Sequence, residues 1–236
     1  MAELLLELYS EEVPPQLQIA ARSQIKQFIE KTFEEENIKY KELLVYSSPT
    51  RLTLFIKDLA EKIKTEAKEI KGPKVGSTDQ IIQGFLRAKN VSENDLIEKE
   101  TNKGKFYFIK TQSKSILVED LLIKIIPRAI GAINWKKSMK WSDHNLMWGR
   151  PLRAIFARYN NKKLVFNYEH LVVTDEVIIE QDLITKTKKI KDFKDYLNFL
   201  KSNKIMVDQK EREEIILKKI SYFSQSKQYK EKLNTK

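Results

Sequence analysis

The chain has 236 residues, of which 41% are hydrophobic and none is cysteine, and its formal net charge is +11. This length and apolar content support a folded core in one or two domains and exclude a disordered tail. The lack of cysteine excludes disulfides, thiol nucleophiles and cysteine-ligated zinc, and it fits a reducing compartment.

The N-terminal sequence MAELLLELYSEE carries acidic residues where a signal peptide has a basic start and a long apolar run. No apolar run in the chain approaches the length of a membrane span. We therefore expect a cytoplasmic protein without a membrane partner.

The front of the chain predicts a strand, a helix and a hairpin. Residues 3–9 (ELLLELY) favour a short buried strand, and Pro14 and Pro15 then open a stretch with helical apolar periodicity. The apolar positions of this helix are Leu17, Ala21, Ile25, Phe28, Ile29 and Phe33. Residues 42–46 and 50–59 predict the two strands of a hairpin.

Turn residues over 71–77 (KGPKVGS) come next, and a short helix over 81–89 and a strand over 105–110 follow them. The polar loop between this helix and this strand could hold one helical turn. Residues 115–133 regain helical periodicity, and Pro127 should kink or split that helix.

Beyond residue 150 the pattern predicts three short strands, at residues 151–159, 164–168 and 177–180. A helix over 190–200 and a brief strand over 205–207 follow. A last helix opens at Asp208, because Asp208 and Glu211 three residues on fit a capping box.

These elements predict an α+β fold, with a mixed or largely antiparallel sheet packed with amphipathic helices and a small helical C-terminal segment. We expect two parts. Residues 1–185 form the α+β region, and residues 186–236 form a basic, mostly helical segment. The final sequence SQSKQYKEKLNTK has no apolar periodicity, so the second part is expected to be an incomplete domain.

All three tryptophans lie within residues 135–153, WKKSMKWSDHNLMWGRPLR, beside five basic residues and one acid. Aromatic faces can stack on bases, and Lys or Arg can bind phosphates. This interleaving is therefore typical of proteins that hold nucleic acid without reading a long sequence. The alternative is a set of buried anchors with solvated lysines between them, and the aromatic spacing alone favours burial.

The positive charge is concentrated in two segments. Residues 135–153 carry +4 and residues 186–236 carry +8, whereas the rest of the chain sums to −1. A near-neutral body with two positive segments is typical of a polyanion binder. Only eight of the 44 basic residues are arginine, however, and a compositional drift toward lysine would also produce this excess.

Residue patterns for catalysis or metal binding are weak. His144 and His170 are far apart in the sequence, without the spacing of a metal pair, and the six glycines form neither a phosphate loop nor a dinucleotide fingerprint. Glu7, Glu11 and Glu12 resemble paired catalytic carboxylates, but their place ahead of a helix favours a structural role near its N-terminus. We expect no metal site and no catalytic residue.

Several short motifs follow one another in order along nearly the whole chain. They are LLLELYSEEVPP at 4–15, SPTRLTLFIKDLAEK at 48–62, KGPKV at 71–75, GFLRAKNVSENDL at 84–96, KSMKW at 137–141, RPLR at 150–153 and, more weakly, VDQKEREEI at 207–215. In this order and spacing they resemble the N-terminal part of the beta subunit of bacterial heterotetrameric glycyl-tRNA synthetase.

The chain departs from that family's pattern in three respects. Tyr9 stands where a glycine is usual, and VIIEQDL at residues 177–183 stands where a Gly-His-Arg-Phe motif is usual. The chain also corresponds to roughly the front third of the length that the resemblance leads one to expect, without the later helical region or the anticodon-binding region.

The resemblance implies an α2β2 aminoacyl-tRNA synthetase, a ligase of protein biosynthesis, whose alpha subunit holds the class II active site. That subunit binds ATP and magnesium, forms the glycyl adenylate and transfers glycine to the 3′ end of tRNA(Gly). The beta subunit contributes tRNA binding and assembly. We therefore expect this chain to carry no active site and no cofactor, and to have the alpha subunit and tRNA(Gly), not DNA, as partners.

The best candidates for phosphate contact are the cations of the tryptophan-rich stretch, Lys136, Lys137, Lys140, Arg150 and Arg153, with Arg51, Lys71 and Lys74 as weaker ones. The tryptophans are expected to be framework. The alternative for KSMKW and RPLR is a turn or an interface with the alpha subunit. Two rival interpretations also stay open: an autonomous RNA-binding or assembly protein from a shortened gene, and an inactive fragment.

Overall fold

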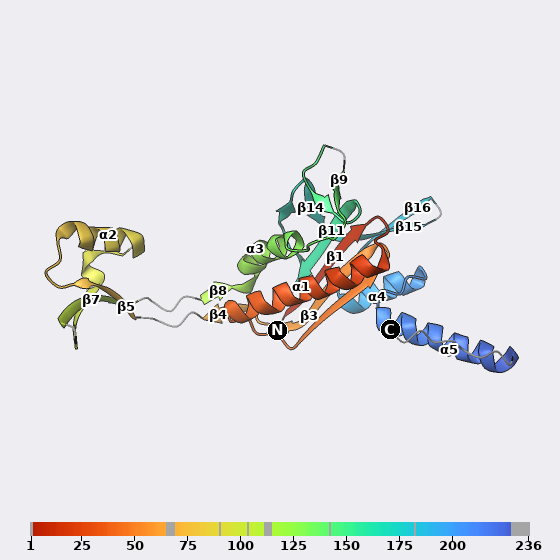
Figure 1. The fold of residues 1–236 in the computed structure, drawn as a ribbon, viewed down its shortest axis with the longest axis horizontal. Helices are drawn as coiled ribbons and strands as arrows, with labels where there is room; N and C mark the ends of the chain where they lie inside the picture. Colours follow the sequence, from red (N-terminus) through yellow and green to blue (C-terminus); the bar gives the residue numbers. More distant parts are fainter. Residues whose placement is uncertain are drawn as a thin grey trace. The chain divides into compact units, whose positions relative to one another are not determined.

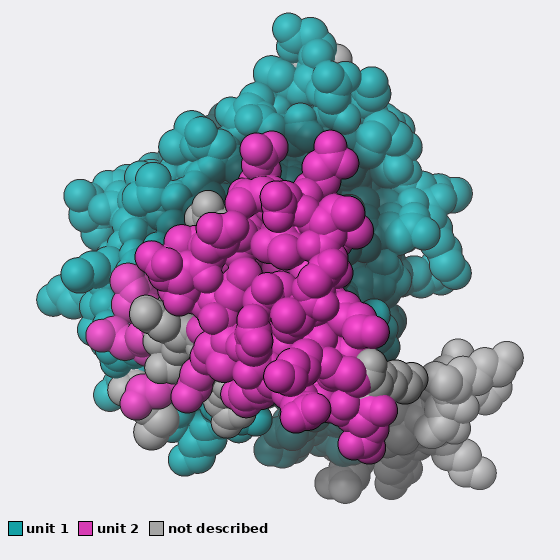
Figure 2. Space-filling view, turned by 90° about the vertical axis from the view of Figure 1, so that its left-hand side faces the viewer, with its two compact units in different colours: residues 1–61, 118–236 teal, residues 62–117 magenta. Residues whose placement is uncertain are grey.

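The computed structural model describes residues 2–64, 69–89, 91–102, 104–110, 115–141, 143–181 and 183–227. The chain forms two compact units: residues 1–61 with 118–236 make unit 1, and residues 62–117 make unit 2 (Figure 2). The boundary that the sequence predicts between residues 185 and 186 instead falls inside strand β16 (Ile184–Lys189) of unit 1.

Unit 1 is built on a seven-stranded sheet with the strand order β13-β14-β11-β1-β3-β2, to which β12 adds by pairing with β11. The strands are β1 (Ala2–Ser10), β2 (Glu42–Ser48), β3 (Arg51–Leu59), β11 (Leu152–Tyr159), β12 (Lys162–Lys163), β13 (Asn167–Tyr168) and β14 (Leu171–Thr174). All pairs are antiparallel except β11 with β14, which are parallel. The predicted α+β class with a mixed, largely antiparallel sheet is confirmed.

Helix α1 (Pro15–Glu35) lies over one face of this sheet, with α3 (Val118–Gly131) beside it (Figure 1). The predicted apolar stripe forms the inner side of α1, because Ala21, Ile25, Ile29 and Phe33 are all buried. Pro127 lies inside α3 but does not split it. Proline lacks a backbone N–H, so Pro127 removes one helical hydrogen bond to the preceding turn, and α3 continues past it to Gly131.

Helix α4 (Phe193–Ser202) and the hairpin of β15 (Glu176–Gln181) and β16 cover the other face. The core between these elements and the sheet contains three sheet residues, Leu5, Phe55 and Phe156. From the covering segment it contains Val177, Ile179, Ile190, Tyr196, Leu200 and Val207. Successive residues of a strand point to opposite faces, and β1 is buried on both. This two-sided burial explains the continuous apolar run near the N-terminus.

The C-terminal residues extend this second layer. Helix α5 (Gln209–Lys227) begins after Asp208, whose carboxylate accepts a hydrogen bond from the backbone N–H of Lys210 at 2.8 Å. This contact confirms the Asp208 half of the predicted capping box. The strand predicted over 205–207 is absent, since these residues form an irregular segment, although Val207 is buried in the core.

Unit 2 lies between β3 and α3 in the sequence. Its three-stranded antiparallel sheet has the order β5-β7-β6, formed by β5 (Glu69–Lys74), β6 (Leu96–Thr101) and β7 (Gly104–Lys110). Helix α2 (Asp79–Lys89) packs on β5, and a 3₁₀ turn at Glu93–Asp95 follows it. Strands β4 (Lys62–Lys64) and β8 (Ser115–Leu117) pair where the chain enters and leaves the unit.

The KGP motif of unit 2 is a strand and not the predicted turn. Gly72 and Pro73 lie in β5, and the turn begins at Val75. A Cβ atom at Gly72 would stand 2.7 Å from the ring of Phe85 in α2. Glycine is therefore needed here because the helix approaches the strand closely.

No helix among the described residues is long and apolar enough to cross a membrane.

We predict that Gly72→Ala destabilises unit 2 by roughly 1–3 kcal/mol, because the new methyl group overpacks against Phe85. Faster amide hydrogen exchange in β5 and β7 would report this loss. Gly84→Ala is the matched control, since Gly84 lies in α2 and a methyl group added there would meet no atom within 4 Å. It should stabilise the helix by roughly 0.5–1 kcal/mol. Equal effects of the two substitutions would contradict the packing argument.

Candidate nucleic-acid interface

The tryptophan-rich stretch folds into a short hairpin of β9 (Met139–Lys140) and β10 (Met147–Trp148). The indoles of Trp135 and Trp148 pack together, with ring centroids 4.8 Å apart, and both side chains are buried. A Cβ atom on Gly149 would stand 2.6 Å from the Trp135 ring, so this position requires glycine. These contacts confirm that Trp135 and Trp148 are framework.

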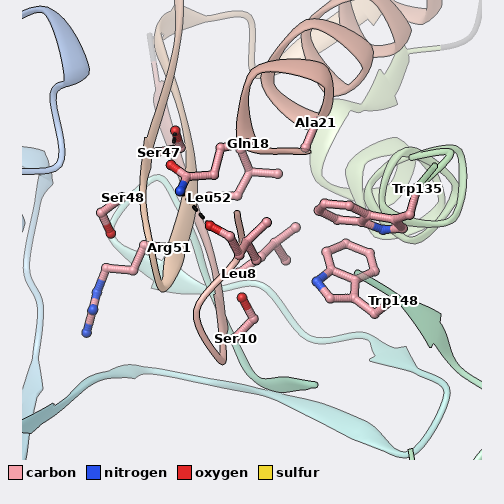
Figure 3. Close-up of a pocket in the computed structure, with 11 residues that line it drawn as sticks. Leu8, Ser10, Gln18, Ala21, Ser47, Ser48, Arg51, Leu52, Trp135 and Trp148 are labelled. Atoms are coloured by element: carbon pink, nitrogen blue, oxygen red, sulfur yellow. Dashed lines mark hydrogen bonds between the residues drawn. The ribbon is translucent and has the colours of Figure 1, made fainter. Parts of the chain in front are cut away.

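The two tryptophans close one end of a cavity between α1 and the sheet, and Arg51 lines its other end (Figure 3). The cavity measures about 10 Å³, which is room for about one water molecule. Gln18 crosses it, donating to the carbonyl of Val13 at 2.7 Å and accepting from the Ser47 hydroxyl at 3.1 Å. This space is too small for a nucleotide, so any RNA contact made by the tryptophan-rich stretch must lie on the surface of its hairpin.

Four predicted cations of this stretch reach that surface. Lys136, Lys137 and Lys140 are exposed, and Arg150 is partly exposed. Within the described ranges none of the four forms an ion pair; the ammonium group of Lys140 donates to the neutral amide oxygen of Asn145 at 3.0 Å. Among the described residues, no carboxylate therefore pairs with these four positive charges. We call these four residues the hairpin cations.

Arg153 is placed differently from the hairpin cations. Its guanidinium donates to both carboxylate oxygens of Glu180, at 2.6 and 3.1 Å, and to Glu11 at 3.1 Å. Two acids therefore neutralise its charge, which weakens it as a phosphate contact. Lys71 and Lys74 are exposed, but they belong to unit 2 and not to the hairpin.

Arg51 is a structural residue, which corrects its place among the phosphate candidates. Its side chain is only 3% exposed, and Nε lies 3.1 Å from Oε2 of Glu7. The guanidinium also donates to the hydroxyl of Thr50 at 2.9 Å and to the carbonyl of Ile178. A phosphate has no access to this group. The acid within the apolar run ELLLELY was the available signal, because a buried carboxylate needs a cation close by.

Glu7 is the centre of a buried polar cluster. The hydroxyl of Tyr196 in α4 donates to Oε2 of Glu7 at 2.6 Å, and Thr53 lies 2.8 Å from the same hydroxyl. Burial raises the pKa of Glu7, although Arg51 and the tyrosine hydroxyl oppose this shift. The pKa of Tyr196 is also raised, first by burial and then by Glu7. A carboxylate that is 1% exposed has no substrate access, so Glu7 is structural through this pairing and not through the start of a helix.

The cluster continues toward the surface through Tyr9. The Arg51 guanidinium lies 4.7 Å from the centroid of the Tyr9 ring, and the Tyr9 hydroxyl donates to Glu180 at 3.0 Å. Burial and the adjacent Glu180 raise the pKa of Tyr9 to about 12, so the phenol keeps its proton. Because Glu180 also binds Arg153, one connected set of polar contacts joins β1, β3, β11, β15 and α4.

The two histidines meet in the fold, which their separation in the sequence did not predict. The rings of His144 and His170 stack with centroids 3.5 Å apart and an interplanar angle of 10°. Asp143 Oδ1 lies 3.8 Å from Nδ1 of His144. In the part of the chain that the structure describes, no group of three or more His, Cys, Asp or Glu side chains could hold a metal ion.

Sequence comparisons agree with the motifs that suggested a family. Residues 4–236 match the family described as "Glycyl-tRNA synthetase beta subunit". The chain is 34% identical over 218 residues to the glycine–tRNA ligase beta subunit of Rickettsia felis, and 35% identical over 216 and 218 residues to those of Rickettsia akari and Rickettsia prowazekii. These alignments cover 92% of this chain and 32–33% of each relative.

The match assigns the chain to a class, the subunits of aminoacyl-tRNA synthetases. Within that class it belongs to the glycyl-tRNA synthetase beta subunit family, and the resemblance carried by the motifs is confirmed. The chain spans about a third of the length of the relatives that it matches.

We predict that Glu7→Gln destabilises unit 1 by about 3–5 kcal/mol, because it leaves the Arg51 cation buried without its counter-ion. Arg51→Met should cost a similar amount by stranding Glu7. The double variant should lose clearly less than the sum of the two single losses, as urea unfolding would show. If the two losses simply add, Glu7 and Arg51 do not act as a pair.

Proposed function

We propose that this chain is a tRNA-binding and assembly part of glycyl-tRNA synthetase, and that the hairpin cations contact tRNA phosphates. In this proposal an alpha subunit activates glycine with ATP and magnesium and transfers it to tRNA(Gly). The chain itself carries no active site and binds no cofactor. Membership of the beta subunit family supports this division of work.

The observation that carries the proposal is that the hairpin is anchored in the core while its cations face solvent. Trp135 and Trp148 anchor its base in the core, while Lys136, Lys137 and Lys140 project into solvent without a paired acid in the described structure. Uncompensated cations release counter-ions when they bind a polyphosphate, which is the main source of sequence-independent affinity for nucleic acid. Because the hairpin is already anchored in the core, it loses less conformational entropy when it binds RNA.

The acids around Arg51 and Arg153 support a binding role over a catalytic one. Glu7, the most buried carboxylate of the cluster, is occupied by Arg51 and Tyr196 and has no opening to solvent. Glu11 and Glu180 are both engaged by Arg153. These three acids are thus used to hold strands together.

We predict that the triple variant Lys137→Ala, Lys140→Ala, Arg150→Ala binds tRNA(Gly) more weakly and with less salt dependence. The slope of log Kobs against log salt concentration should become shallower by about 2–3, because three phosphate contacts are lost. Filter binding at several salt concentrations measures this slope. Far-UV circular dichroism and the unfolding midpoint should not change, since the three side chains are not buried.

The matched control is Lys31→Ala, Lys39→Ala, Lys41→Ala, which removes the same charge from exposed positions elsewhere on unit 1. It should leave the slope nearly unchanged. If the hairpin variant binds tRNA(Gly) like the wild type but no longer associates with the alpha subunit, the hairpin is a subunit interface and the proposal is wrong. A matching slope in both triple variants would also reject it, because net charge alone would then explain binding.

A further inference from the structure

The sheet of unit 2 has two faces of different character. Helix α2 packs on one of them, where Phe85 lies against Gly72 and both Leu86 and Ile109 are buried. The other face carries the alternate residues of the same three strands, since successive side chains of a strand point to opposite sides. That second face carries aromatic rings with lysines beside them.

Two phenylalanines of the central strand stand on the second face. Phe108 is directly opposite Lys71 on one neighbouring strand and Ile97 on the other, and Phe106 is opposite Lys99. Residues paired in this way point to the same side of an antiparallel sheet. We call Phe106, Phe108, Ile97, Lys71 and Lys99 the aromatic face. It reaches solvent, because Ile97 is 43% exposed and Lys71 is exposed.

The rings of the aromatic face are approached by ammonium groups. Nζ of Lys71 lies 3.5 Å from the centroid of Phe106, and Nζ of Lys99 lies 5.9 Å from the centroid of Phe108. At this distance the ammonium group of Lys71 covers one flat side of the Phe106 ring. A nucleotide base can occupy the same position once the lysine turns toward a phosphate.

Charge on the sheet is divided between its two faces. Residues 62–117 include twelve basic and seven acidic residues. On β6, Glu98 and Glu100 alternate with Lys99 and so point to the side of α2. On the aromatic side, Lys71, Lys99 and Lys110 face one acid among the described strand residues, Glu69, which binds Lys99 at 2.6 Å. Long charged side chains of either sign could serve only to cover the sheet face with their apolar stems. A surplus of positive charge, as found here, favours binding of a polyanion.

We propose that the aromatic face binds an unpaired segment of RNA, with bases stacked on Phe106 and Phe108 and a phosphate held by Lys71, because Glu69 already pairs with Lys99. Open sheets in RNA-binding proteins stack two or three bases on aromatic side chains in this manner. The two rings are about 7 Å apart along the strand, so each can take one of two neighbouring bases. The inference rests on the proposed function only in taking RNA as the ligand, and it uses none of the hairpin cations.

The test uses the full chain and a short single-stranded RNA that carries 2-aminopurine. Binding to the wild type should quench the 2-aminopurine fluorescence, because the base stacks on a ring. Phe106→Leu with Phe108→Leu keeps apolar side chains but removes the rings, and it should weaken binding about 30-fold if each base contributes a stack. Phe106→Tyr with Phe108→Tyr keeps both rings and should bind like the wild type.

The control variant is Tyr222→Leu, which removes an aromatic ring that is 75% exposed on α5 in unit 1. It should not change binding of the short RNA. If the leucine double variant does not fold, the wild type and the tyrosine variant still decide the matter. Saturable binding without quenching in those two proteins overturns the proposal. Unchanged RNA affinity of a folded leucine variant overturns it as well. If that variant keeps its RNA affinity but no longer binds a protein partner, the aromatic face is a protein interface and the proposal is wrong.

The same proteins separate this inference from the hairpin proposal. The triple variant at Lys137, Lys140 and Arg150 should retain affinity for the short unpaired RNA, since none of its substitutions lies in unit 2. If the leucine double variant binds the short RNA normally while the triple variant loses tRNA(Gly), the aromatic face is rejected and the proposed function stands. If the leucine variant alone loses the short RNA, the aromatic face stands whatever the hairpin does.

Discussion

The buried ion pair between Glu7 and Arg51 is the constraint on which the architecture of unit 1 depends. A carboxylate in the middle of a strand that is buried on both faces is costly unless a cation and hydrogen-bond donors reach it. Arg51 on the adjacent strand and Tyr196 on α4 meet this need, and both contacts require the observed register of β1 with β3. A shift of one residue would turn Glu7 to the side of α1, where the sheet is lined by leucine and isoleucine.

This constraint also explains why the C-terminal helices belong to unit 1. Tyr196 can reach Glu7 only if α4 lies on the sheet, and the core around Leu200 and Val207 is built around that contact. The opposite face of the sheet carries α1 and the tryptophan anchors of the hairpin. The ion pair therefore lies with α4 on one side of the sheet and the tryptophan anchors lie with α1 on the other, while Arg51 also lines the small cavity that the tryptophans close.

Periodicity in the sequence predicted the elements whose burial is one-sided or complete. The strand at the N-terminus, α1, the β2–β3 hairpin and α2 follow from local apolar spacing, whereas α5 follows from the capping pattern at Asp208. Strand β6 was missed because LIEKET has three consecutive charged residues and lies at the edge of a small sheet, so it lacks the apolar alternation of a half-buried strand. At Arg51 the alternation of apolar and polar residues predicted a strand, but it did not predict which groups surround the Arg51 side chain. The stacking of His144 on His170 depends on tertiary contact and leaves no mark on either local sequence.

The two proposed RNA surfaces differ in the physical origin of their affinity. The hairpin cations would act through counter-ion release, whose contribution to affinity weakens steeply as salt concentration rises. The aromatic face would add base stacking, which depends little on salt and requires bases that are not paired in a helix. A tRNA presents both paired helices rich in phosphate and unpaired bases. A protein that uses both surfaces keeps part of its affinity at high salt and distinguishes a folded tRNA from a plain duplex, a selectivity that positive charge alone does not supply.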